Sequence, residues 1–252
     1  KLLFSRCTNA LVNIDDEYGA RLYGEISCNK FSFSEKNSDA DFSADFIKLH
    51  GGGSSYWLSD RKKTYKVDIR LPGSYNVSNS TAAGIAKIPG VRGRCELVDT
   101  GRDFSVILDY AHTPDALVNI LETVREFAKG RVVCLFGCGG NRDAKKRPLM
   151  AKAAAADFLI ITSDNPRDED PHEIITQIIK GLDADFKEYI EIDNRRDAIF
   201  WAVKNAQKDD VIVLAGKGHE DYQILAGGVK IHFDEREVVK DALAAAFADE
   251  GK

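Results

Sequence analysis

The sequence predicts an α/β fold in which helices cover a mainly parallel sheet. From about residue 103 onward, short apolar runs rich in β-branched residues alternate with helix-length amphipathic stretches. The runs are continuously apolar, as is typical of strands buried on both faces. Clusters of glycine and polar residues follow these runs, where strands end and helices begin.

The first part of the chain, residues 1 to about 92, is less regular and is expected to be the sheet-rich remainder of a larger domain. Strands are expected at 10–14, about 26–33, 42–49 and 65–70, with Gly51-Gly52-Gly53 between the last two. Pro72-Gly73 and Pro89-Gly90 interrupt the chain before the second part. The expected boundary lies near Val91 and gives domains 1–91 and 92–252.

The second part contains the expected parallel strands and their helices. Strands are predicted at 104–108, 132–136, 158–162, 189–192 and 211–214. A first helix begins at Thr113-Pro114, and a second begins at Asp170-Pro171 and ends at Gly181. A third carries the apolar residues Ala198, Ile199, Ala202 and Val203, and the last runs over about 235–248. Segments 222–225 and 230–233 flank a Gly-Gly pair and predict a terminal β-hairpin.

Composition excludes several classes of protein. The 252 residues are 44% hydrophobic and 30% charged, which excludes general disorder. The net charge is −5, and no segment gathers enough basic residues to suggest a duplex nucleic-acid surface. No apolar run approaches the roughly 20 residues of a membrane span, so we expect a cytoplasmic protein without membrane partners. The five cysteines form no CxxC pair and are expected to be buried thiols.

Polar clusters follow the predicted strands, and the carboxyl ends of parallel strands are where ligands bind. In the first cluster, Asp109 could hold a ribose or a metal-bound water and His112 could reach a phosphate; alternatively, both cap the next helix. The second, 137–143, joins a glycine-rich turn containing Arg142 to the basic residues 145–147. It suggests capture of a carboxylate or phosphate, or merely a solvated helix start.

Each of two further clusters contains both acidic and basic residues. Asp164-Asn165-Pro166-Arg167 suits a ligand with both an ammonium and a carboxylate, because Asp pairs the first and Arg forks onto the second; a plain turn is the alternative. Gly216 to Glu220 lacks the spacing of a P-loop, but Glu220 or His219 could bind an amine. Four clusters at the ends of strands of one sheet predict a binding site there.

Candidate residues also lie near the expected boundary. Asn76 and Asn79, three residues apart, fit one helical face and could read an adenine edge; the alternative makes Asn76 a helix N-cap. Arg94 could reach a phosphate, or could be an exposed linker arginine.

Taken together and in this order, the motifs closely resemble those of the Mur ligase family over nearly the whole chain. The matching segments are 15–16, 71–79, 90–96, 109–114, 137–150, 164–171 and 216–220. The resemblance implies the remainder of a P-loop-type central ATPase domain followed by a Rossmann-like C-terminal domain that binds an amino acid. It also implies ATP and Mg²⁺ as cofactors, small-molecule substrates and a monomer.

The resemblance further implies a reaction and the residues that serve it. ATP would phosphorylate the D-glutamyl carboxylate of UDP-N-acetylmuramoyl-L-alanyl-D-glutamate, and the amine of meso-diaminopimelate would attack the acyl phosphate. ATP would contact Asn76, Asn79, Arg94, Asp109 and His112. The diaminopimelate pocket would comprise Arg142, Asp164, Asn165, Pro166, Arg167, Gly216 and Glu220, with no residue assigned to catalysis. Arg167 would favour diaminopimelate over L-lysine, which lacks the second carboxylate.

The chain also departs from the family pattern. Walker A and the uridine-binding domain are absent from the 252 residues, so we expect a fragment that does not catalyse the reaction alone. Lys1-Leu2-Leu3-Phe4 resembles the segment of the lysine that the family carbamylates to hold Mg²⁺, and Lys1 lies at that residue or next to it. The same absence leaves a rival hypothesis, a non-catalytic module that binds an amino acid or nucleotide.

Overall fold

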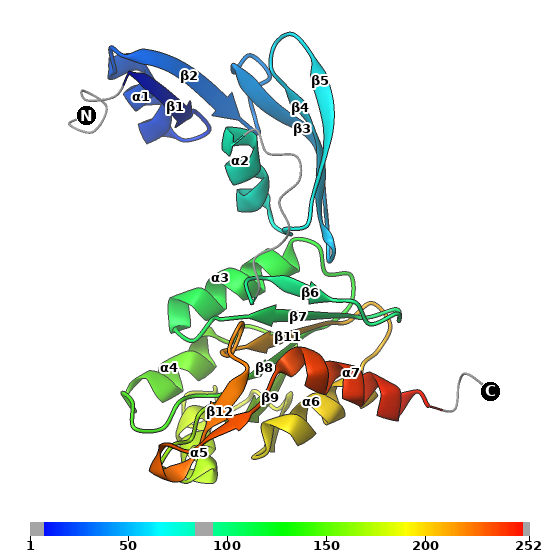
Figure 1. Cartoon of the computed structure of the whole chain (residues 1–252). Coiled ribbons are helices and arrows are strands. Elements are labelled where there is room, and N and C mark those ends of the chain that lie inside the picture. Colours follow the sequence, from blue (N-terminus) through cyan, green and yellow to red (C-terminus); the bar gives the residue numbers. More distant parts are fainter. Residues whose placement is uncertain (1–7, 84–92, 249–252) are drawn as a thin grey trace. The chain divides into compact units, whose positions relative to one another are not determined.

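The computed structural model describes residues 8–83 and 93–248, which belong to two compact units (Figure 1). Lys1 and the expected boundary at Val91 lie outside the described residues. No helix within the two described ranges is long and apolar enough to span a membrane.

The first unit is a five-stranded mixed sheet with two helices. Its strands lie in the order β1-β2-β3-β4-β5, with β1 to β3 parallel and β3 to β5 antiparallel. A small core forms around Tyr56, Val67 and Val77. In chain order the elements are β1 (Asn9–Asn13), α1 (Glu17–Glu25), β2 (Asn29–Ser34), β3 (Phe42–His50), β4 (Gly53–Ser59), β5 (Thr64–Ile69) and α2 (Ser74–Ala83).

Two elements of this unit were not expected from the sequence. Helix α1 buries no residue fully, although Leu22 and Tyr23 pack against a small core beside β1; it begins where the Asp16 side chain accepts a hydrogen bond from the Gly19 N–H. Strand β4 begins at Gly53, within the glycine run expected to separate two strands. It forms because β3 and β5 pair with it on both sides. Gly53 has φ +144°, and a Cβ there would lie 1.9 Å from the Ile69 carbonyl oxygen.

The second unit confirms the predicted α/β fold. Its six-stranded sheet has the order β10-β9-β8-β11-β7-β6, and every neighbouring pair except β6-β7 is parallel. The strands are β6 (Glu96–Val98), β7 (Ser105–Asp109), β8 (Val132–Phe136), β9 (Phe158–Thr162), β10 (Tyr189–Ile192) and β11 (Val211–Ala215). Predicted strand positions agree within one residue. The short edge strand β6 was not predicted.

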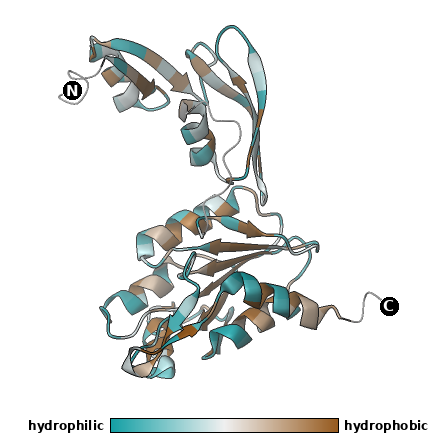
Figure 2. Ribbon diagram, viewed as in Figure 1, coloured by the Kyte–Doolittle hydropathy of each residue, from teal (hydrophilic) through white to brown (hydrophobic). Residues whose placement is uncertain are grey.

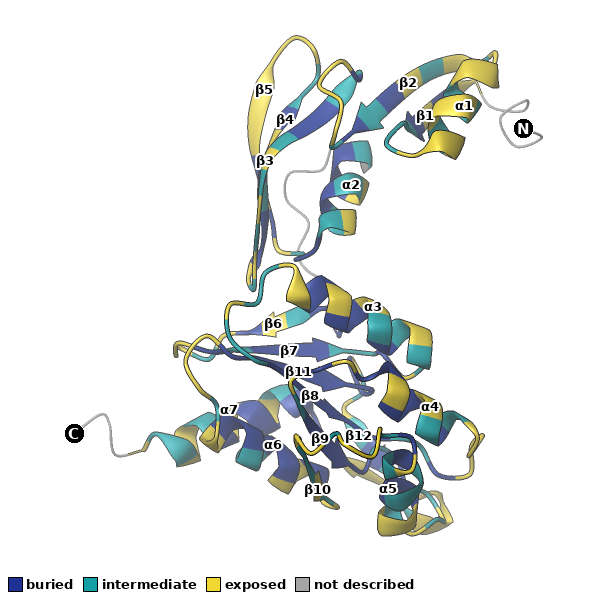
Figure 3. Ribbon diagram, turned by 180° about the vertical axis from the view of Figure 1, so that it is seen from behind, coloured by how far each residue is buried: buried dark blue, intermediate teal, exposed yellow. Residues whose placement is uncertain are grey.

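Helices cover both faces of this sheet. Helices α3 (Pro114–Arg125), α4 (Lys146–Ala153) and α5 (Pro171–Ile179) pack their apolar sides on one face, and α6 (Arg195–Lys204) and α7 (Glu235–Ala246) on the other. Figure 3 shows each with a buried and an exposed side, and Figure 2 shows the hydrophobic strands between them. The chain leaves β8 for α4 on one face and leaves the adjacent β11 toward α7 on the other. Such a divergence opens a crevice at the carboxyl ends of the strands.

The predicted hairpin is present as β12 (Tyr222–Ile224) and β13 (Lys230–His232), joined by a 3-10 turn at Ala226–Gly228. It packs against the segment that follows β9. The Arg167 N–H donates to the Ile224 carbonyl oxygen at 3.1 Å, and the Gly227 N–H donates to Asp168 Oδ1 at 2.8 Å. The hairpin therefore supports the third of the polar clusters.

Candidate functional site

A pocket of about 560 Å³ lies at the carboxyl ends of the parallel strands in the second unit. Its volume is in the range of small-molecule sites. The lining residues come from the connections after β7, β8, β9 and β11. They include Arg142, Asp164, Asn165, Arg167, Gly216, Glu220 and His112, which the sequence had singled out.

The acidic part of the pocket is built around a buried lysine that the sequence did not single out. The Lys217 Nζ lies 3.4 Å from Asp164 Oδ1, 3.4 Å from Glu220 Oε2 and 3.1 Å from Asn165 Oδ1. Asn165 Nδ2 donates to Glu220 Oε2 at 3.1 Å, and its Oδ1 also accepts from the Ile224 N–H at 3.0 Å. Asn165 is therefore largely engaged within the protein.

The basic part of the pocket contains Arg142, Lys146 and Arg167. Arg142 is exposed, whereas Arg167 is anchored: its Nη1 donates to the carbonyl oxygens of Gly140 at 2.9 Å and Asn165 at 3.3 Å. Within the described residues, Nε and Nη2 of Arg167 make no hydrogen bond to the protein, so they can fork onto a carboxylate. The turn holds Arg167 at φ +53°. Pro166 is buried beside Gly140 and does not line the pocket.

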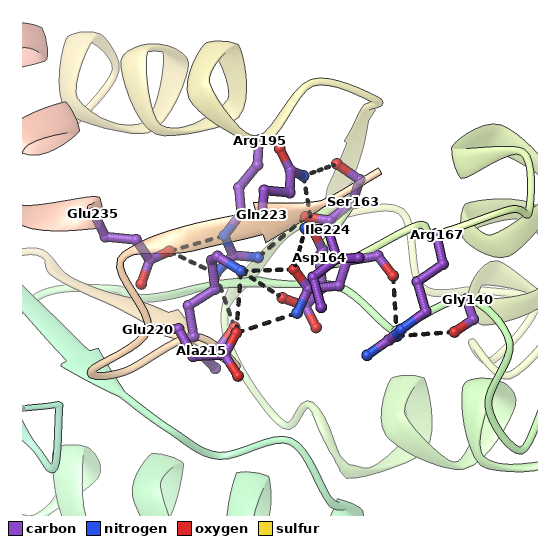
Figure 4. Close-up of polar contacts among 12 residues, drawn as sticks. Gly140, Ser163, Asp164, Arg167, Arg195, Ala215, Glu220, Gln223, Ile224 and Glu235 are labelled. Carbon is purple, nitrogen blue, oxygen red and sulfur yellow. Dashed lines mark hydrogen bonds and ion pairs between the residues drawn. The ribbon is translucent and has the colours of Figure 1, made fainter. Parts of the chain in front are cut away.

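A buried ion pair fixes the backbone behind the acidic residues (Figure 4). Arg195 Nη2 lies 2.7 Å from Glu235 Oε1, and neither side chain is exposed to solvent. The guanidinium also donates to the carbonyl oxygens of Ala215 at 2.9 Å and Ser163 at 3.4 Å, the residues that precede Gly216 and Asp164. Burial raises the pKa of Glu235, and Arg195 opposes this shift.

A second buried arginine fixes the glycine-rich turn after β8. Arg147 donates to Gln177 Oε1, to Glu169 Oε1 and to the Gly139 carbonyl oxygen. Glu169 in turn accepts from the Asn141 N–H. The bond from Arg147 lowers the pKa of Glu169, helped by the Asn141 N–H. The basic run 145–147 therefore divides: Arg147 is structural, while Lys146 lines the pocket.

The residues expected to serve ATP in this unit adjoin Tyr110. The Arg94 guanidinium lies 4.9 Å from the centre of the Tyr110 ring, and the His112 ring lies 4.6 Å from it. Asp109 Oδ1 accepts from the Ala111 N–H and Oδ2 from the Cys95 N–H, at 2.8 and 2.7 Å. Burial raises the pKa of Asp109, against the effect of these two bonds.

Two alternative interpretations of these motifs are wrong. Thr113, rather than Asp109 or His112, caps α3, since its side chain accepts from the Ala116 N–H. Asn76 is not an N-cap: it lies inside α2, and its Nδ2 donates to the Pro72 carbonyl oxygen at 2.8 Å. Asn79, three residues along the same helix, is exposed. Both asparagines belong to the first unit.

The described residues contain no group of three His, Cys, Asp or Glu side chains arranged to hold a metal ion. Cys95 and Cys134 are buried and Cys138 is partly buried, all three as free thiols. Burial raises the pKa of each of them to about 12.

The sequence did not single out Tyr110 as a site residue, nor the buried charges of Lys217, Arg147, Arg195 and Glu235. Lys217 and Arg147 stood inside named motifs, but charged side chains are usually exposed, and nothing in a motif shows which ones turn inward. Arg195 and Glu235 come directly after helix N-caps, which is the only local signal they carry.

Two family models match the chain in sequence order. The Mur ligase middle domain matches residues 1–87, and the Mur ligase glutamate ligase domain matches residues 93–218. Each matched segment lies within one of the two compact units, and residues 219–252 of the second unit follow the second match.

Relatives agree with these matches. The UDP-N-acetylmuramoyl-L-alanyl-D-glutamate--2,6-diaminopimelate ligase of Clostridium tetani is 44% identical, over 96% of this chain and 53% of its own length. The ligase of the same name from Listeria innocua is 44% identical, over 90% of this chain and 49% of its own. The chain thus spans about half the length of the curated relatives it matches.

Solved structures give the same result. A structure of a UDP-N-acetylmuramoyl-L-alanyl-D-glutamate--2,6-diaminopimelate ligase matches with a TM-score of 0.75 and 32% identity, covering 94% of this chain and 53% of that one. A MurF ligase from Thermotoga maritima, solved with ADP, shares the fold at 13% identity and a TM-score of 0.56, over 96% of this chain and 54% of that one. With family models matched along both units, this chain belongs to the Mur ligase family.

Proposed function

We propose that the chain is the C-terminal half of an ATP-dependent ligase that adds meso-diaminopimelate to UDP-N-acetylmuramoyl-L-alanyl-D-glutamate in peptidoglycan precursor synthesis. The observation that carries this proposal is the pocket in which Asp164 and Glu220 occur together with Arg142 and Arg167. The identity to relatives of that name supports the same substrate.

The pocket chemistry suits an amino acid with an ammonium and additional carboxylates. Asp164 and Glu220 would pair with the ammonium, and the free Nε and Nη2 of Arg167 would bind a carboxylate in a forked geometry. L-lysine lacks the second carboxylate and would leave that arginine without its ligand, which disfavours it. Arg142, exposed at the same pocket, provides a second cation for a carboxylate.

In the proposed reaction, ATP transfers its γ-phosphoryl group to the D-glutamyl carboxylate and leaves as ADP. The free amine of diaminopimelate then attacks the acyl carbon, and the tetrahedral intermediate expels phosphate and loses a proton to give the amide. No residue of this chain is assigned a covalent role. The pocket residues hold the amine in position, which converts a bimolecular encounter into an oriented one.

The ATP contacts are proposed on family membership together with local geometry. Arg94 and His112, both exposed beside Tyr110, would bind phosphate oxygens, and Asp109 would lie on the ribose side. Asn76 and Asn79 of the first unit would contact adenine. Mg²⁺ is proposed on family membership alone, as are a cytoplasmic location and a monomeric state.

Calorimetry of the chain with meso-diaminopimelate and with L-lysine tests the amino-acid assignment. We expect binding of diaminopimelate only, reduced at least tenfold in Arg167→Ala. Arg125→Ala is the matched control. Arg125 pairs with Asp157, the residue before β9, so this pair lies at the amino ends of the strands, opposite the pocket. Equal binding of both ligands, or an unchanged affinity in Arg167→Ala, would overturn the assignment.

The ligase activity is tested on the protein encoded by the complete gene. We expect release of phosphate from ATP that requires both the UDP-linked dipeptide and diaminopimelate. A protein that binds diaminopimelate but releases no phosphate would instead support the rival hypothesis of a non-catalytic binding module.

A further inference from the structure

We propose that Lys217 is a positioning residue of the amino-acid pocket: its buried ammonium fixes Asp164 and Glu220 and leaves them one net negative charge to offer the ammonium of the ligand. This inference rests on the proposed function, because it concerns how the same pocket recognises an amino acid.

The burial of Lys217 makes it part of the protein framework. None of its surface is exposed, and its Nζ has three oxygen neighbours at 3.1–3.4 Å, from Asp164, Asn165 and Glu220. The Tyr222 and Phe233 rings lie 6.0 Å from the same nitrogen. A lysine is rarely buried unless it is paired, so its three oxygen partners account for its position.

The charge balance of the cluster follows from its members. Asp164 and Glu220, whose side chains are 15% and 17% exposed, carry two negative charges, and Lys217 carries one positive charge. The other charged groups behind the cluster, Arg195 and Glu235, form a pair that sums to zero. One net negative charge remains on this acidic part of the pocket, which matches a single ammonium group, while Arg142, Lys146 and Arg167 line the basic part. Without Lys217 the two carboxylates would repel each other, which favours uptake of a proton by the pair.

Lys217 also sets the orientation of Glu220 through Asn165. The Asn165 amide directs Oδ1 toward Lys217 and the Ile224 N–H, so its Nδ2 is directed toward Glu220. Loss of the ammonium would release Glu220 from Lys217 and would remove one of the two donors that orient the Asn165 amide, leaving the Ile224 N–H as the other. We therefore expect substitution of Lys217 to weaken binding of the amine and to leave the binding of ATP nearly unchanged.

The test compares Lys217→Met with wild type in the protein encoded by the complete gene, by steady-state release of phosphate. We expect the KM for diaminopimelate to rise at least tenfold and the KM for ATP to stay within twofold. The acid limb of the pH profile of kcat/KM for diaminopimelate should move upward by at least half a pH unit, because a protonated carboxylate no longer pairs with the ammonium. Lys217→Gln, which keeps a donor without the charge, should give the same shift.

Arg131→Met is the matched control. Arg131 pairs with the buried Asp210 at 2.7 Å, and both residues directly precede strands, at the opposite end of the same sheet. Its loss also leaves a buried carboxylate without a cation, but away from the pocket. We expect Arg131→Met to lower the stability of the protein. The KM for diaminopimelate and the pH profile of kcat/KM should stay unchanged.

The outcomes separate this inference from the proposed function. An inactive wild type would overturn the proposed function, whereas an active wild type with unchanged KM and pH profile in Lys217→Met would overturn the role of Lys217 alone. If neither Lys217 variant folds, the inference is tested by NMR on wild-type protein whose lysines carry 15N at Nζ. A slowly exchanging ammonium signal that moves on addition of diaminopimelate is expected, and no such signal would refute the inference.

Discussion

The strongest energetic prediction concerns two adjacent arginines at the start of α6. Arg195 pairs with Glu235 where both side chains are fully buried, whereas Arg196 pairs with Asp241 where the two side chains are 47% and 56% exposed. Both acids belong to α7. The distance between the charged groups is 2.7 Å in each pair, so the two substitutions differ mainly in burial.

We expect Arg195→Met to lower the free energy of unfolding by about 3–5 kcal/mol at pH 7, because it leaves the Glu235 carboxylate buried without a counter-ion. The carbonyl oxygens of Ser163 and Ala215 also lose a donor. Arg196→Met should cost about 0–1 kcal/mol, since an exposed pair is screened by water. At lower pH the cost of Arg195→Met should shrink, because a protonated Glu235 carries no charge.

Urea unfolding followed by tryptophan fluorescence measures the difference. The chain has two tryptophans, Trp57 in the first unit and Trp201 in the second, so a Trp57→Phe background reports the second unit alone. With an m-value of about 2 kcal/mol/M, the midpoint for Arg195→Met should fall by roughly 1.5–2.5 M.

A double variant separates the effect of the unpaired buried charge from the effect of the changed side-chain shape. Adding Glu235→Leu to Arg195→Met should recover most of the loss, to within about 1–2 kcal/mol of wild type, because neither charge of the buried pair remains. The reasoning fails if Arg195→Met costs no more than Arg196→Met, or if the double variant is less stable than Arg195→Met alone.

Three further predictions address the pocket and the surface. Gly140→Ala should weaken diaminopimelate binding in calorimetry at least tenfold, because a Cβ would lie 1.8 Å from the Pro166 carbonyl oxygen and force the two pocket turns apart; unchanged affinity would contradict the packing. Cys138 should resist iodoacetamide at pH 8 in mass spectrometry, since burial raises its pKa to about 12, and rapid labelling of the folded protein would refute this. His232→Gln should reduce stability at pH 5.5 but not at pH 8.5: the bond to Glu237 raises the His232 pKa, so its stabilisation is present below the unfolded-state value of about 6.5 and is lost as pH rises through the folded-state value. Thermal scans at the two pH values should therefore differ, and equal effects would count against the pair.

The sequence was sufficient to predict the parallel sheet of the second unit. Strands such as β8 and β11 are buried along their whole length, so their apolar runs stand out between helices with N-caps and apolar stripes. It failed for β4, β6 and α1, which have weak local signals and form because neighbouring segments supply their partners. Strand β4, for example, contains Gly53 and three serines, and pairing on both sides holds it in the sheet.

The candidate site likewise has residues that the sequence predicted and residues that only the tertiary structure revealed. Sequence motifs identified Asp164, Arg167 and Glu220 because polar residues after buried strands converge at one edge of a parallel sheet. Only the tertiary structure showed that Lys217 and Arg195 turn inward, because all of their partners except Glu220 lie 20 to 53 residues away in the chain. The local pattern thus determined most of the residues that reach the pocket, and long-range packing decided which charges hold it in place and which remain for a ligand.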